Sequence, residues 1–367
     1  MRAGLASGLL IILTLLVCRL MPTTSGVSGP EQAKPTYVPP NGYVCYRASG
    51  PIKIDGRLDE ASWRDVPWTD WFVDIEGDAK PKPRFRTRAK MLWDDQYFYV
   101  AAELEEPHVW ATLTQHDSVI FHDNDFEVFI DPNGDNHEYY EFEINALNTG
   151  WDLLLPRPYK DGGRALNSWE IPGLKTAVHI DGTLNDASDT DKGWSVEIAF
   201  PWKVLGELAY QPAAPKDGDQ WRVNFSRVEW QHEIADGKYR KVAGKKEDNW
   251  VWSPQGVIDM HRPEKWGYVQ FSTAKVGEAK VRPDPTGPAR QVLHTIYYAQ
   301  RGYRQKHQHW AKSFKELGLS DLGHDSLAGP PRMDVTDSLF QATVEIKQPE
   351  GKTHRWHIRH DSRVWTD

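Results

Sequence analysis

Cysteine is scarce in this chain of 367 residues: it has only 2, Cys18 and Cys45. Cys18 lies in an apolar N-terminal segment that we expect to be removed. Cys45 would then be left alone, so no intramolecular disulfide could form. Packing, rather than covalent cross-links, must therefore stabilise the fold.

An excess of positive charge is also lacking, since the formal net charge is −8. The charge is uneven, because residues 275–367 hold 15 basic and 11 acidic side chains and the preceding part is strongly acidic. A protein that binds nucleic acid mainly through phosphates needs the opposite balance. We therefore expect no nucleic-acid partner for the larger part of the chain.

Long apolar runs are rare, and the longest, "LLIILTLLVC" (9–18), stops at Arg19. It is too short to span a bilayer, and the small residues of "PTTSG" follow it, as expected near a signal-peptidase site. A membrane anchor helix is the alternative, and a lipoprotein at Cys18 is disfavoured by the large Val17 before it. The sequence predicts a signal peptide over 1–26 and a secreted protein, extracellular or periplasmic, that is not an integral membrane protein once processed.

Short strands separated by turn residues dominate the rest. Between two linkers rich in proline and glycine, 27–42 and 274–290, polar and apolar residues alternate with little helical periodicity. The strand patterns are "RAKMLWDDQYFYVAAEL" (88–104), "NDFEVFIDPNGDNHEYYEFEIN" (124–145), "GWSVEIAFPW" (193–202), "QWRVNFSRVEW" (220–230) and "KWGYVQF" (265–271). They predict a mainly β domain over 43–273, an antiparallel β-sandwich of jelly-roll-like form.

The C-terminal residues 291–367 follow a different pattern. Apolar side chains recur at helical spacing and share one face of a helix that Gly318 would end: Val292, Ile296, Ala299, Tyr303, Trp310, Phe314 and Leu317. Two alternating strands then flank "QPEGK". We expect a small α+β unit with one long helix and a β-hairpin. It is loosely similar to the soluble part of pilin-like proteins, and we interpret its basic helix face as solvated.

Five blocks of the predicted sandwich resemble carbohydrate-binding module family 9, in the family's order. They are "IDGRLDEASWRDVPW" (54–68), "KMLWDDQYFYVAAELEE" (90–106), "NDFEVFIDPNGDNHEYYEFEIN" (124–145), "GWSVEIAFPW" (193–202) and "NWVWSPQGVIDMHRPEKWGYVQF" (249–271). The resemblance implies a CBM9-like or DOMON-like β-sandwich that holds a sugar between two aromatic rings. In the characterised xylanase modules the sugar is the reducing end of cellulose and xylan chains.

The family's binding residues correspond to four positions of this chain. One ring falls at Phe121, the sugar-binding acid at Glu127, and the second ring with its amide at Trp252 and Asn249. An aromatic face can stack on the C–H face of a pyranose, while carboxylates and amides hydrogen-bond its hydroxyls. Trp250, two residues before Trp252, is interpreted as packing.

Each position has a plainer interpretation: Trp252 as a core indole, Glu127 as a solvated strand carboxylate, and Phe121 as packing on Val119. This chain also departs from the family pattern. Glu141 and Glu143 stand where the family has an arginine, and Phe121 replaces a tryptophan. The resemblance therefore implies binding in the same cleft without implying specificity for xylan or cellulose.

Calcium is expected from the resemblance only, as a structural ion with unknown ligands. "DPNGDNH" (131–137) begins with an EF-hand-like spacing of oxygens at Asp131, Asn133 and Asp135. Asn136 and Phe142 occupy the places where such a loop needs glycine and glutamate. A solvated turn is the favoured interpretation.

Two other functions stay open. A noncovalent haem site could use His261 or Met260, although His261 is better explained as a structural residue. A glycoside hydrolase acting on O-glycosyl bonds could use Asp123, Asp125 and Glu127, but residues that alternate on one strand share a face and do not flank a bond. We favour noncatalytic binding of a plant-type polysaccharide or oligosaccharide. A partner glycoside hydrolase would be a separate protein, because the remaining chain is too short for one.

Overall fold

The computed structural model describes residues 37–210, 214–347 and 352–367. The predicted signal peptide, most of the first linker and the turn within "QPEGK" lie outside these residues. Among the residues that are described, no helix combines the length and the apolarity needed to cross a membrane.

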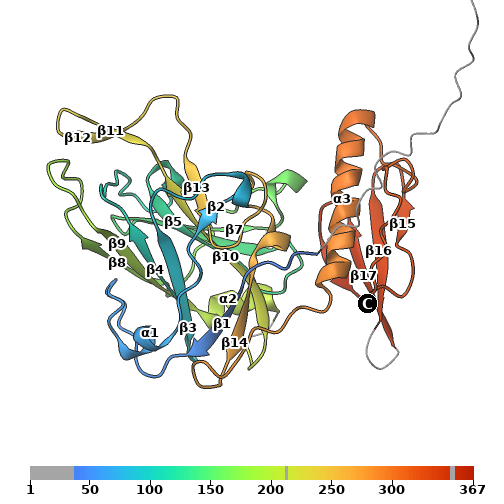
Figure 1. Ribbon diagram of the computed structural model, residues 1–367, viewed down its shortest axis with the longest axis horizontal. Coiled ribbons are helices and arrows are strands. Elements are labelled where there is room, and N and C mark those ends of the chain that lie inside the picture. Colours follow the sequence, from blue (N-terminus) through green and yellow to red (C-terminus); the bar gives the residue numbers. More distant parts are fainter. Residues whose placement is uncertain (1–36, 211–213, 348–351) are drawn as a thin grey trace, which may run out of the picture. The chain divides into compact units, whose positions relative to one another are not determined.

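A single curled sheet of 12 strands forms the larger part (Figure 1). Along its main path the order is β7-β6-β5-β10-β14-β1-β3-β4-β9-β8, while β13 pairs with β10 and β2. The strands are β1 (Gly42–Arg47), β2 (Val73–Asp74), β3 (Thr87–Trp93), β4 (Tyr97–Glu105), β5 (Asp125–Asp131), β6 (Tyr139–Asn145), β7 (Gly150–Leu155), β8 (Lys175–Asp181), β9 (Gly193–Pro201), β10 (Gln220–Glu229), β13 (Asp248–Val251) and β14 (Gly267–Ser272). A separate hairpin consists of β11 (His232–Ala235) and β12 (Lys238–Lys241).

The predicted mainly β class is confirmed, and so are both predicted hairpins. β3 and β4 pair antiparallel around Asp94-Asp95, and β5 pairs antiparallel with β6. The exception to the antiparallel prediction is β1, which lies parallel to both β14 and β3. Alternation of side chains is the same in either direction of pairing, so the sequence could not reveal this.

The core lies inside the curl of the sheet. Successive side chains of a strand point to opposite faces, and the inward set of β4, β5, β9, β10 and β14 forms one apolar cluster that includes Phe98, Phe126, Ile198, Phe225 and Phe271. The other side chains of β5, β6 and β10 point away from this core. That outer face carries the predicted site.

Helical segments in the larger part are short and connect strands. They are α1 (Ala61–Asp65), α2 (Trp202–Ala209) and the 3-10 turns η1 (Gly77–Ala79), η2 (Ile120–His122), η3 (Tyr159–Asp161) and η4 (Pro263–Lys265). Two of the turns matter for the sites below, because η2 lies over the outer face of β6 and η4 precedes β14.

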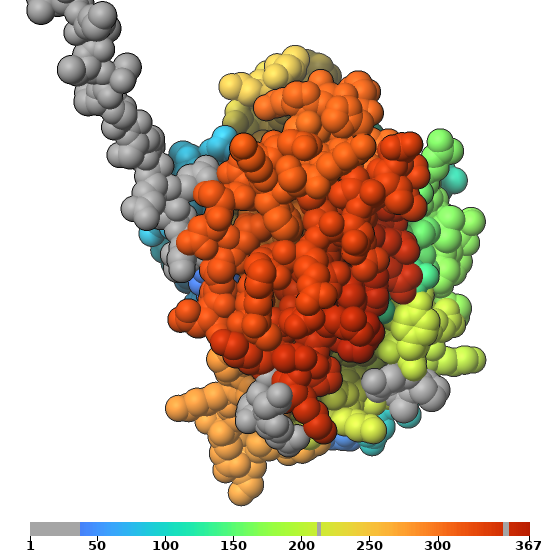
Figure 2. Space-filling view, turned by 90° about the vertical axis from the view of Figure 1, so that its right-hand side faces the viewer, coloured from blue at the N-terminus to red at the C-terminus, as the bar shows by residue number. Residues whose placement is uncertain are grey.

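The C-terminal unit contains one helix and a four-stranded antiparallel sheet in the order β15-β16-β17-β18. Its elements are α3 (Gly287–His307), β15 (Arg332–Val335), β16 (Phe340–Lys347), β17 (Thr353–Arg359) and β18 (Val364–Thr366). The predicted strand pair is confirmed as β16 and β17, and two further strands extend it. In Figure 2 the helix and these strands make up the surface that faces the viewer.

The predicted extent of the helix was wrong. α3 begins at Gly287, within the predicted linker, and ends at His307, where Gln308 takes a left-handed conformation with φ 63°. Trp310, Phe314 and Leu317 therefore lie beyond the helix, although they still pack on the core of the unit. Their spacing mimicked a helix because they face the same core.

Candidate functional site

Four acidic side chains gather on the outer face of β5 and β6. In β5, Asp125 and Glu127 alternate with core residues, and in the paired strand β6 Glu143 lies directly opposite Glu127. Glu141 is two residues from Glu143 and shares its face. We call Asp125, Glu127, Glu141 and Glu143 the acidic floor.

The acidic floor is compact and buried. One carboxylate oxygen each from Asp125, Glu127 and Glu143 lies within 4.8 Å of the others, and no floor residue is more than 6% exposed. Within the described parts of the chain no ion pair involves these four carboxylates, and Asp125 Oδ2 and Glu141 Oε2 lack any hydrogen-bond partner there. The floor can therefore accept hydrogen bonds from hydroxyls or ligate a hard cation such as calcium.

Burial raises the pKa values of all four carboxyl groups of the floor. It raises the pKa of Glu127 to about 7, against a smaller lowering effect from Ser226. Burial, reinforced by the charge of Glu127, also holds the pKa values of Asp125, Glu141 and Glu143 well above their ordinary range. At neutral pH the floor thus offers protonated carboxyls as donors as well as carboxylates as acceptors.

Two half-buried aromatic residues lie at the floor. The backbone N–H of Phe121, on η2, donates to Glu143 Oε2 at 2.9 Å. The Phe121 carbonyl accepts from Trp230 Nε1, also at 2.9 Å. Lys241 of β12 places its Nζ 3.5 Å from the Trp230 ring centroid. Phe121 and Glu127, predicted from the resemblance, are thus brought together.

Trp230 was missed by the sequence analysis. It is the last residue of "QWRVNFSRVEW", one position beyond β10, where the alternation of the strand no longer says which way a side chain points. The sequence signal for Trp230 as a candidate site residue was its place at the end of a predicted strand. Only the tertiary contact with the Phe121 carbonyl identifies it as a neighbour of the floor.

The Trp252 prediction does not fit the structure. Trp252 is 2% exposed, and its ring packs in the core 5.8 Å from the ring of Phe225. Trp250, two positions earlier, is 3% exposed, so its interpretation as packing is confirmed. Both indoles belong to the same apolar core cluster, away from Glu127 on the outer face. A buried ring offers no face to a sugar.

Asn249 lies on the outer side of the sheet. It pairs with Val228 in β10, which in turn pairs with Asp125 in β5. Directly paired residues project to the same face, so half-buried Asn249 shares the face of the floor, two strands away. The structure therefore groups Phe121 and Glu127, places Asn249 at the edge, and separates Trp252 from them.

The turn "DPNGDNH" uses its oxygens within the protein. Asp131 accepts from the backbone N–H groups of Gly134 and Asn136 at 2.8 and 3.0 Å. Asp135 accepts from the N–H of His137 and pairs with Arg363. Asp131 is fully buried, so this is a hydrogen-bonded structural turn rather than the solvated turn we expected.

The residues of the two alternative functions have structural partners. His261 Nδ1 lies 2.8 Å from the Tyr139 hydroxyl, and burial lowers its pKa to about 3. The Met260 carbonyl accepts from Trp266 Nε1. Asp123 accepts hydrogen bonds from the N–H and hydroxyl of Thr112, from the Leu113 N–H and from Asn145 Nδ2. The other two candidate catalytic acids, Asp125 and Glu127, both lie on the acidic floor.

The curated relatives of this chain include two much longer enzymes. Exoglucanase XynX of Acetivibrio thermocellus is 28% identical over 155 residues, which make up 41% of this chain and 12% of that protein. Endo-1,4-beta-xylanase A of Thermoanaerobacterium saccharolyticum is 27% identical over 155 residues, 41% of this chain and 11% of that protein. The chain thus spans only a small part of the length of these relatives.

Two solved structures are also similar. One is a family 9 carbohydrate-binding module from Caldicellulosiruptor kristjanssonii in complex with cellotriose, with 15% identity, a TM-score of 0.42, and coverage of 66% of this chain and 100% of that one. The other is a putative carbohydrate-binding protein from Bacteroides uniformis, with 18% identity, a TM-score of 0.44, and coverage of 64% and 100%.

The family comparison covers most of the sheet that carries the floor. The model of the family described as carbohydrate family 9 binding domain-like matches residues 54–270, from before α1 into β14. This is more than half of the chain, and it includes Phe121, the acidic floor and Asn249. The chain belongs to the carbohydrate family 9 binding domain-like family.

Proposed function

We propose that this protein binds a plant-type polysaccharide or oligosaccharide without cleaving it, at the acidic floor. The observation that supports this most directly is the hydrogen bond from the Phe121 N–H to Glu143, which places the half-buried Phe121 at the floor within the family's domain. The enzymes among the relatives act on glucans and xylans by their names. We therefore choose sugars of these kinds as first ligands to test.

The chemistry of the floor suits a pyranose. The Phe121 ring supplies an apolar surface for one C–H face of the sugar. Asp125, Glu127 and Glu143 can accept from hydroxyls, and a protonated carboxyl among them can donate. In this proposal Trp230 is the second ring in place of Trp252, and Asn249 contacts a sugar unit farther along the face.

The arrangement of the acids favours binding over hydrolysis. A glycosidase places two carboxyl groups on opposite sides of the scissile bond. Asp125 and Glu127 instead extend from one face of one strand, and Asp123 is occupied by loop contacts. We propose that any cleavage belongs to a separate, secreted glycoside hydrolase, and that this protein is itself exported by its N-terminal segment.

Calcium fits the floor better than it fits the 131–137 turn. Asp125, Glu127 and Glu143 provide hard oxygen ligands close together, and Asp125 Oδ2 has no other partner among the described residues. We propose these three residues as the calcium ligands. A bound ion would offset part of the negative charge of the floor and fix the carboxylates beside Phe121.

Calorimetric titration with cello- and xylo-oligosaccharides, in calcium and separately in EDTA, tests the sugar site. We expect saturable binding that Phe121→Ala weakens by about tenfold, since stacking and lost apolar contact together contribute about 1.5 kcal/mol. Trp252→Phe should bind as tightly as the unmodified protein. Tyr210→Ala, which removes a ring that is 65% exposed elsewhere, is the matched control.

Three results would contradict the proposal. One is the absence of binding across the panel, and another is an affinity that Phe121→Ala leaves unchanged. Release of reducing sugar that Glu127→Gln abolishes would show that the floor is catalytic. A Soret band in the purified protein would instead support noncovalent haem binding.

A further inference from the structure

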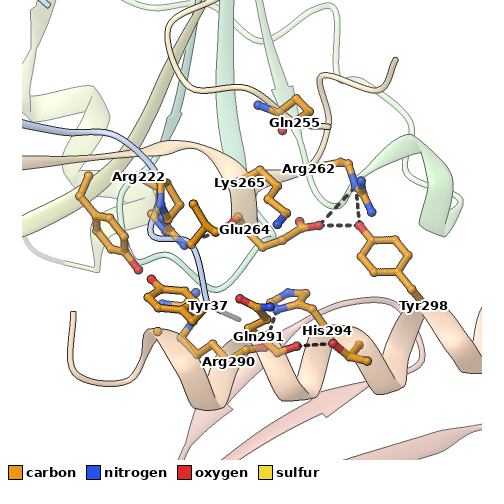
Figure 3. Close-up of a pocket in the computed structure, with 15 residues that line it drawn as sticks. Tyr37, Arg222, Gln255, Arg262, Glu264, Lys265, Arg290, Gln291, His294 and Tyr298 are labelled. Carbon is orange, nitrogen blue, oxygen red and sulfur yellow. Dashed lines mark hydrogen bonds and ion pairs between the residues drawn. The ribbon is translucent and has the colours of Figure 1, made fainter. Parts of the chain in front are cut away.

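A polar cavity of 290 Å³ lies between the first turns of α3 and the segment around η4. Figure 3 shows Arg262, Glu264 and Lys265 on one side of it and Arg290, Gln291, His294 and Tyr298 on the helix opposite. None of its lining residues belongs to the acidic floor. Its size is at the lower end for small-molecule sites.

Positive charge dominates this cavity. Arg222, Arg262, Lys265 and Arg290 line it, against one lining carboxylate, Glu264. Arg222 and Arg290 are 5% and 8% exposed. Cations that are this buried normally have anionic partners.

The two buried arginines are only partly satisfied. Arg222 donates from Nη1 to the Trp266 carbonyl at 2.8 Å and from Nη2 to the Glu264 carbonyl at 3.1 Å. Arg290 donates to the Gly134 carbonyl and lies 3.9 Å from Asp284. The Nε atoms of both arginines are buried without a partner among the described residues. They are two buried donors that no described residue satisfies.

The start of α3 also favours an anionic ligand. The helix begins at Gly287, which also lines the cavity. The helix then runs along the cavity as far as Tyr298, so the positive end of its dipole lies at one end of the cavity. An anion is favoured at such an end, together with the buried arginines.

The cavity also contains buried acceptors. Gln255 Oε1 and Glu264 Oε2 have no hydrogen-bond partner among the described residues. Burial raises the pKa of Glu264, but Lys160, His294 and Arg262 outweigh it and lower the pKa to about 2, so Glu264 is ionised. Such acceptors suit the hydroxyl groups of a ligand and disfavour a second anionic group beside them.

We propose that this cavity binds an acidic monosaccharide of the uronic acid class. The carboxylate lies between Arg222 and Arg290 with Lys265 nearby, and the hydroxyls donate to Gln255 and Glu264. A guanidinium group is well suited to a planar carboxylate. This site is separate from the acidic floor and does not depend on the proposed function there.

Calorimetry on the full chain with D-glucuronate tests this inference, with glucose as its neutral counterpart and inorganic phosphate as a simple oxyanion. We expect saturable glucuronate binding that weakens at least tenfold in Arg290→Gln, because the variant removes a charged hydrogen-bond donor to the carboxylate. Lys265→Gln should also weaken it, and this half-buried side chain can be changed with little effect on folding. Glu127→Gln and Phe121→Ala should leave glucuronate binding unchanged.

The outcomes separate the two sites. Glucuronate binding that is lost in Phe121→Ala but kept in Arg290→Gln and Lys265→Gln would overturn the inference, because the ligand would then lie at the floor. Binding of phosphate without glucuronate, or binding of neither, would also overturn it. Thermal melts of each variant identify any loss that comes from unfolding, and Lys265→Gln decides the question if Arg290→Gln does not fold.

Discussion

Gly267 lies directly against the indole of Trp252: a Cβ atom on Gly267 would come within 2.4 Å of Trp252 Cζ3. Gly267 is the first residue of β14, and Trp252 follows β13. The bare backbone at 267 thus makes room for the ring inside the core. This contact explains why Trp252 is buried rather than available to a ligand.

Gly267→Ala should destabilise the protein by about 1–3 kcal/mol, because the added methyl group overpacks a closed core. Trp252→Phe removes the ring atoms that the methyl group would meet. In the double variant the two changes should therefore compensate by about 1 kcal/mol. Urea unfolding of the four proteins measures this coupling, and strictly additive effects would contradict the contact.

The free energy of unfolding should depend on pH through Glu127. Its pKa is about 7 in the folded protein and about 4.3 in an unfolded chain. Between these values the folded state holds a proton that the unfolded state releases, so stability is highest below about pH 4.3 and falls as pH rises towards 7. For Glu127 alone the loss is about 3 kcal/mol. Urea unfolding in EDTA at several pH values measures it.

Glu127→Gln should flatten this dependence. Burial also raises the pKa of Glu197 to about 7, so Glu197 makes the free energy of unfolding fall with rising pH in the same way. Glu197 is present in both proteins, so the difference in pH dependence between Glu127→Gln and the unmodified protein reports on the floor. Glu233→Gln, on the exposed hairpin strand β11, is the control. An unchanged slope in Glu127→Gln would show that Glu127 does not titrate as inferred.

Calcium should bind more weakly in Glu127→Gln if the floor holds the ion, because one charged ligand is lost. In the unmodified protein, added calcium should raise the midpoint of thermal unfolding, since an ion that binds only the folded state stabilises it. Calorimetric titration of calcium into the EDTA-treated, dialysed protein measures the affinity. Asp135→Asn, in the 131–137 turn, should keep the affinity, and a loss there instead would place calcium in that turn.

Glu197→Gln should destabilise the larger part of the protein. The Glu197 carboxylate accepts from Trp63 Nε1 at 2.7 Å and from the backbone N–H groups of Asp55 and Gly56 at 2.9 and 2.8 Å. A glutamine amide has one oxygen and turns its NH₂ group towards a donor. We expect a loss of about 2–3 kcal/mol, measured by urea unfolding at pH 8. A loss below 0.5 kcal/mol would contradict this reading.

Asp161→Asn should loosen the contact between η3 and the C-terminal unit. Asp161 accepts from Tyr297, from Arg301 at 2.8 Å and from Ser362 at 2.7 Å. The variant removes the charge that faces Arg301. We expect faster proteolysis within 274–286, followed by mass spectrometry. Asp325→Asn, an exposed change elsewhere in the unit, should leave the cleavage rate unchanged.

The sequence by itself determined the β class and the main strand pairs. Alternation in 124–145 around Pro132-Asn133-Gly134 defines β5 and β6, since strand periodicity and turn residues are local properties. The same alternation, together with the family resemblance, placed Glu127 on one face and Phe121 near it. The order of the five blocks was enough to identify the family.

Tertiary structure decided the rest. Whether Trp252 faces a ligand or the core depends on which side of β13 the curled sheet encloses, and no residue near Trp252 encodes that. The end of α3 at His307 was hidden because Trp310 and Phe314 face the same core as the helix. The cavity beside Arg222 and Arg290 exists only because distant segments meet. The acidic floor lies on one local hairpin, but its burial under other segments changes what its carboxyl groups can bind.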